Sequence, residues 1–199
     1  MRIRTKWSDK NRDRTPEEIA GVVAFIAWRI SAQAVLDLEN NDFQTDTQVQ
    51  RLAVIWEFAA FLIHVTDRMM YERMDQEERA VFIQAMAKSM AQSMQDNMED
   101  FLGPGEYKPD LIQTLNLRLN EYAQFNYSKE SGPSFPMLRD FGENVTAVMG
   151  DRQKKWITTH IIDIEAPDAI KTLKRGIANL LPAEESEEKP DEKSEDRVG

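Results

Sequence analysis

The segment Leu52–Val65 places the strongest constraint on the fold, because every residue in it is apolar except Glu57 and His64. A helix that is apolar around most of its circumference is buried on most sides in a water-soluble protein. The segment is also shorter than the roughly 20 residues that a bilayer span needs. The pattern therefore predicts a helix over about 46–73 that lies at the centre of a bundle.

Helix-start signals occur on both sides of this segment. Three capping boxes, in which a Thr or Asp is followed three residues later by Glu or Gln, predict helix starts at Thr15, Thr45 and Asp75. Gly103 and the proline after it predict the end of the third helix. The three helices are expected over about 15–38, 46–73 and 76–102.

Proline and glycine divide the second half of the chain. Pro109 and Pro167 are expected at helix starts, and the stretch 131–136 is expected to form a loop. Gly150 weakens the middle helix of this half, and no convincing strand pattern appears. The expected helices cover about 109–128, 136–165 and 167–182. We therefore predict an all-α, single-domain bundle of five to six helices, with the helix over about 46–73 central.

The two ends of the chain carry opposite charges. Residues 1–14 hold six basic and two acidic side chains, a local charge of +4. Residues 183–199 hold eight acidic and three basic side chains, a local charge of −5. We expect a flexible basic arm over 1–14, a helical bundle over 15–182 and a disordered acidic tail over 183–199. The tail has too little apolar surface to offset the entropy cost of ordering.

Composition excludes several classes of function. The chain has 25 basic and 35 acidic residues, a net charge of −10, and no cysteine. Nucleic acid is not expected as the main partner, because phosphate binding needs concentrated positive charge. Without cysteine there is no disulfide, thiolate zinc site or cysteine nucleophile. We find no secretory signal and expect no transmembrane segment, which predicts a cytoplasmic protein.

The two histidines of the chain occur in the same local pattern: His64 precedes Asp67 by three residues, and His160 precedes Asp163 by three. Positions i and i+3 share a helix face, so each pair could present an imidazole beside a carboxylate. Glu57 lies two turns before His64 on the same face. If the two helices faced each other, these five side chains could bind iron, manganese or zinc. The alternative, which we favour, is that each His–Asp pair forms a local hydrogen bond and binds no metal.

Glu57 also raises a question of its own. A carboxylate in an apolar run needs a cation or a hydrogen-bond donor, and the candidate cations are Arg29, Arg51, Arg68 and Arg152. One interpretation is a proton-handling group in a pocket. The other, which we favour, is a buried ion pair that fixes helix register, because no nucleophile or oxyanion hole accompanies Glu57.

A row of methionines is the second unusual feature. Met86, Met90, Met94 and Met98 recur every four residues along one expected helix. Methionine is flexible and polarizable, so the row could form an adaptable groove for a protein partner, or bind copper(I) through its thioethers. The interpretation we favour is a core seam. Complete burial within the monomer would support the seam, and exposure would support the groove.

Sequence signatures of nucleotide sites, hydrolase nucleophiles and zinc proteases are missing, so the sequence favours a protein without catalytic activity or a resident cofactor. The leading hypothesis is a module that binds a protein partner or assembles with a second copy, using the methionine-rich helix face or neighbouring helices. The first alternative is a metal-binding bundle with oxidoreductase activity. The second is a carrier of an apolar small molecule.

Overall fold

Helices make up 80% of the described chain. The structure, a computed structural model, describes residues 14–150 and 154–181. The prediction of an all-α bundle is confirmed. Its helices are α1 (Pro16–Asn40), α2 (Gln48–Met70), α3 (Gln76–Leu102), α4 (Lys108–Tyr122), α5 (Phe135–Met149), α6 (Lys154–His160), the π-helical turn η2 (Ile161–Glu165) and α7 (Ala166–Leu180). The two-residue strands β1 (Tyr127–Ser128) and β2 (Gly132–Pro133) pair antiparallel.

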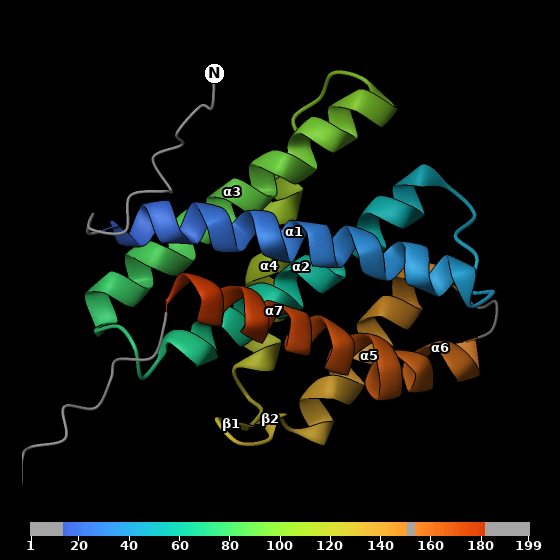
Figure 1. The fold of residues 1–199 in the computed structure, drawn as a ribbon. Coiled ribbons are helices and arrows are strands. Elements are labelled where there is room, and N and C mark those ends of the chain that lie inside the picture. The colour runs from blue at the N-terminus through green and yellow to red at the C-terminus, as the bar shows by residue number, and fades with distance from the viewer. Residues whose placement is uncertain (1–13, 151–153, 182–199) are drawn as a thin grey trace, which may run out of the picture.

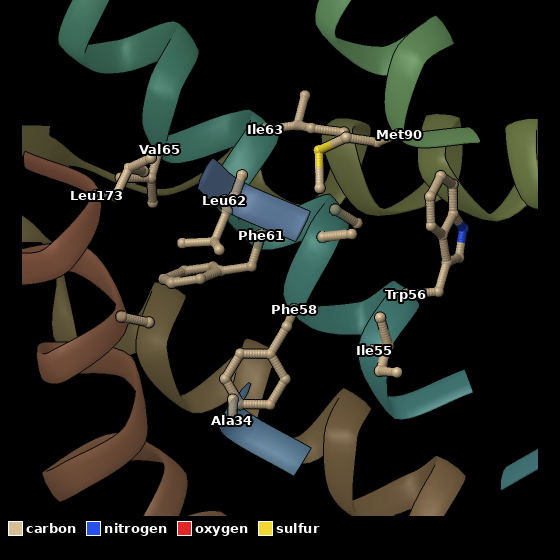
Figure 2. Packing of buried hydrophobic residues seen from close by; sticks show 14 of the residues in the cluster. Ala34, Ile55, Trp56, Phe58, Phe61, Leu62, Ile63, Val65, Met90 and Leu173 are labelled. Carbon is tan, nitrogen blue, oxygen red and sulfur yellow. The ribbon is translucent and has the colours of Figure 1, made fainter. Parts of the chain in front are cut away.

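α2 occupies the centre of the core, as predicted. Every residue over 54–66 is buried, including Glu57 and His64. The ring of Phe61 stacks on Phe141 of α5 with centroids 4.1 Å apart. In Figure 1, α1 lies across the front of the molecule with α7 beneath it, and α2 lies behind both. Figure 2 shows α2 side chains extending toward neighbouring helices on several sides, which is why the segment is apolar around most of its circumference.

Two of the three predicted helix starts are correct. Thr15 caps α1, and Asp75 begins α3 with a complete capping box. The start of α2 is two residues later than predicted: Thr47, and not Thr45, accepts the hydrogen bond from the Gln50 N–H at 3.1 Å. The side-chain amide of Gln50 also donates to two carbonyl oxygens at the end of α5, which joins these two helix ends.

Two predicted boundaries in the second half are wrong. The helix expected to reach about residue 128 ends at Tyr122, and the short β1–β2 hairpin follows it, with Gly132 at a φ of 77°. The helix expected over 136–165 ends at Met149. Gly150 has a φ of 83°, a conformation that favours glycine and that terminates α5.

Pro167 lies in the first turn of α7, which begins at Ala166, as the sequence predicted. α7 is not separated from the preceding helix, however, because α6, η2 and α7 follow one another without a break. Proline lacks an N–H and its ring collides with the carbonyl four residues before it, which disrupts a regular α-helix. The chain adapts through the wider π-helical turn just before Pro167, where the Ala166 N–H bonds to the Ile161 carbonyl.

α1 and α2 are both long and apolar enough to cross a membrane, judged by length and composition alone. Core helices of soluble proteins also pass this test. The most apolar window of α2 is 78% buried inside the bundle, whereas that of α1 is 44% buried. The expected absence of a membrane span and the cytoplasmic location stay predictions. The expected basic arm (1–14, apart from Arg14) and acidic tail (183–199) lie outside the described residues.

Candidate functional site

The two histidines lie far apart. His160 packs against Phe43, which precedes α2, with ring centroids 4.8 Å apart. His64 lies sixteen residues after the first residue of α2, about 24 Å along the helix axis. No group of three or more His, Asp and Glu side chains converges on a metal-sized site within the described residues. The five proposed metal ligands are therefore not brought together.

Neither His–Asp pair forms the predicted local hydrogen bond. Asp67 instead pairs with Arg79 of α3 at 3.3 Å, and Asp163 is exposed. His160 pairs with Glu165 at 3.0 Å, five residues further on. Position i+5 points away from position i in a regular α-helix, and the π-helical turn brings it back over the same face. Burial raises the pKa of the Glu165 carboxyl.

His64 has a different environment. Its side chain is 3% exposed, and its ring lies 5.6 Å from that of Tyr122, centroid to centroid. The Arg68 Nε–H donates to His64 Nε2 at 3.4 Å. Burial, and secondarily the charge of Arg68, lower the pKa of His64 to about 4. The ring is therefore a neutral hydrogen-bond acceptor at neutral pH.

Glu57 forms the buried ion pair that the sequence favoured, but with a cation that was not among the candidates. Arg118 of α4 binds both carboxylate oxygens of Glu57, at 2.7 and 2.9 Å, and Glu121 through its remaining nitrogen at 2.9 Å. Hydrogen bonding to Glu57 raises the pKa of Arg118. The pair joins α2 to α4 and explains a charge in the apolar run without a catalytic role.

Tyr122, next to this pair, has a buried hydroxyl that makes no hydrogen bond of normal geometry with the described residues, although the Asn144 side chain lies close enough to lower its pKa slightly. Burial, and then the charge of Glu57, raise the pKa of that hydroxyl.

We expect Tyr122→Phe to increase the free energy of unfolding by about 1–2 kcal/mol, because it removes an unsatisfied polar atom and keeps the ring contacts. Urea denaturation measures the change. Tyr107→Phe is the control, because the Tyr107 hydroxyl donates to the Gly103 carbonyl at 3.0 Å. Tyr107→Phe should lower the free energy of unfolding by about 1 kcal/mol. A decrease of similar size in Tyr122→Phe would contradict the prediction.

The methionine row lies in the core. Met86, Met90 and Met94 are fully buried, and Met98 is partly buried. Figure 2 shows Met90 extending from α3 toward Ile63 of α2. A folded monomer therefore does not present Met86, Met90 or Met94 to a partner, which is the outcome that supports the core seam.

Residues at the C-terminal ends of α2 and α7 line a surface groove of about 890 Å³. Figure 1 shows these two helix ends close together. We call this groove the basic groove. Its walls come from the end of α2, the turn after it, the β1 hairpin and the end of α7. The lining residues are Arg68, Met69, Tyr71, Glu72, Arg73, Met74, Tyr127, Lys129, Lys174, Ile177, Ala178 and Leu181.

Four cations and one carboxylate line the basic groove, a local charge of +3 on a chain whose net charge is −10. Lys129 pairs with Glu72 at 2.7 Å. Arg68, Arg73 and Lys174 have no carboxylate partner within the parts of the chain that the structure describes. Among the described residues alone, the groove is thus a concentration of unneutralised positive charge.

The side chains of the groove are held in place by their neighbours. The Arg73 guanidinium donates to the Leu181 carbonyl at 3.0 Å, which ties the turn after α2 to the end of α7. Arg79 lies over the Tyr71 ring, 4.9 Å from its centroid. Burial raises the pKa of Tyr127, which therefore stays a neutral phenol. Cations on an apolar and aromatic wall can bind a carboxylate and the carbon atoms beside it.

The sequence did not reveal the groove. Its cations are spread from position 68 to position 174, so no local cluster announces them. The one local signal is the segment 68–74, which mixes two arginines with three methionines and a tyrosine at a helix end.

Comparison with protein-family models, with curated proteins and with solved structures finds no match to this chain.

Proposed function

We propose that the protein is a non-catalytic protein-binding module whose basic groove takes an acidic segment of a partner. This keeps the class of function that the sequence favoured and moves the contact surface away from the methionine row. The observation that carries the proposal is the gathering of Arg68, Arg73 and Lys174, without carboxylate partners in the described chain, in one groove of an acidic protein.

The chemistry of the lining favours a peptide over a compact anion. The cations come from α2, the turn after it, the β1 hairpin and α7, so they are distributed around the walls. Apolar side chains stand between them, among them Met69, Met74 and Ile177. Methionine adapts its shape to different partners, and arginine binds carboxylates in a bidentate manner. Four cations in one groove are more charge than the few polar groups that line a typical site for an apolar small molecule.

Fluorescence anisotropy tests the proposal with a labelled peptide that is rich in glutamate and has a central phenylalanine. We expect Lys174→Glu to weaken binding about tenfold, because it replaces attraction by repulsion at one wall of the groove. Lys171→Glu is the matched control. It makes the same charge change on the same helix at an exposed position outside the groove lining, and we expect little effect.

Three outcomes would contradict the proposal. The first is equal weakening by Lys174→Glu and Lys171→Glu, which would indicate a non-specific response to net charge. The second is equal binding of a peptide with lysine at every glutamate position. The third is complete loss of peptide binding when inorganic phosphate is added at low millimolar concentration. That result would indicate that the groove binds a compact anion.

A further inference from the structure

We propose that the basic groove is occupied in the free protein by the chain's own acidic segment 183–199, which competes with a partner's acidic segment. The inference rests on the proposed function, since it names a resident occupant for the same groove. It gives the groove a built-in competitor that a partner has to displace.

The described chain ends at the groove itself. Leu181 lines the groove, and its carbonyl accepts the hydrogen bond from Arg73 at 3.0 Å. The acidic segment therefore begins two residues from a fixed point on the groove wall. The four glutamates nearest that point lie within seven residues of Leu181, which is at most about 25 Å of extended chain. They are Glu184, Glu185, Glu187 and Glu188.

Charge complementarity supports this occupant. The segment carries −5 and the groove carries +3. A short tether gives an effective concentration on the order of millimolar. A segment with an intrinsic dissociation constant of about 100 μM would then occupy the groove about nine-tenths of the time and weaken a competing peptide about tenfold.

A second group of basic residues occurs in the sequence around the start of α6, at Arg152, Lys154 and Lys155. α6 begins 26 residues before Leu180 in one continuous helical segment, a distance of about 39 Å. The glutamates nearest Leu181 do not reach that far. The position of the chain exit therefore favours the basic groove.

The test uses the full chain and the same labelled peptide. In the first variant the four near glutamates become glutamine: Glu184→Gln, Glu185→Gln, Glu187→Gln and Glu188→Gln. In the matched control the four far acidic residues are neutralised: Asp191→Asn, Glu192→Gln, Glu195→Gln and Asp196→Asn. Both variants lose four negative charges. We expect the first to bind the peptide about tenfold more tightly than the wild type and the control to change affinity less than threefold.

Carbodiimide cross-linking of the wild type gives a second readout. We expect amide links from the near glutamates to Lys174 or Lys129, at a yield independent of protein concentration. Links to Lys154 or Lys155 alone, or a yield that grows with concentration as for a second copy, would overturn the proposal. Equal peptide affinity in the wild type, the near-glutamate variant and the far-acid control would also overturn the proposal. If Lys174→Glu still weakens peptide binding in that case, the groove function stands and the acidic segment is not its occupant. If no variant binds the peptide, the groove function itself fails.

Discussion

Replacing Arg118 by methionine is expected to lower the free energy of unfolding by about 3–5 kcal/mol. Glu57 is 3% exposed, and Arg118 is the cation that binds both of its oxygens. Without that cation the carboxylate is left buried and uncompensated, which costs more than the ion pair itself contributes. Urea denaturation followed by circular dichroism measures the change.

Arg139→Met is the matched control for this variant. Arg139 pairs with Glu143 on the surface, where both side chains are 61% exposed, and such a pair contributes about 0–1 kcal/mol. The double variant Glu57→Met/Arg118→Met should recover to within about 1 kcal/mol of the wild type, because two apolar side chains replace both charges. A cost of Arg118→Met no larger than that of Arg139→Met would contradict the argument.

The sequence predicted those features that depend on neighbouring residues. Thr15 and Asp75 identify helix starts because a cap contacts the backbone within three residues. The burial of α2 follows from a run that is apolar on all sides, and the role of Glu57 as a buried ion pair follows from the cost of leaving it unpaired.

Features that depend on distant residues were not predictable. Glu57 and Arg118 are 61 residues apart, and nothing in the spacing selects that arginine over the four that the sequence offered as candidates. The π-helical turn before Pro167 changes the partner of His160 from Asp163 to Glu165, because it shifts which residues share a face. The basic groove forms where segments distant in the sequence meet, so its charge is visible only in three dimensions.

Lowering the pH should destabilise the protein through His64. The folded protein holds the pKa of His64 near 4 by burial and by the charge of Arg68, against 6.5 for a free histidine. Between these two values the unfolded chain binds a proton that the folded chain does not, so the free energy of unfolding rises with pH across this window. The contribution is complete above about pH 6.5 and is lost as the pH falls toward 4, a total on the order of 3 kcal/mol.

His64→Gln separates this effect from the titration of carboxylates. Glutamine is neutral at every pH in the window and offers an oxygen that can accept the hydrogen bond from Arg68. Urea midpoints at about pH 7 and about pH 4 should show a smaller loss of stability in His64→Gln than in the wild type, by roughly 3 kcal/mol. The control is His160→Gln, which removes the other histidine, paired with Glu165 at 3.0 Å, and should keep the His64-dependent loss. Parallel pH dependence in His64→Gln and the wild type would mean that the imidazole accepts a proton in the folded bundle as readily as in the unfolded chain. The contact with Arg68 would then not be maintained in solution.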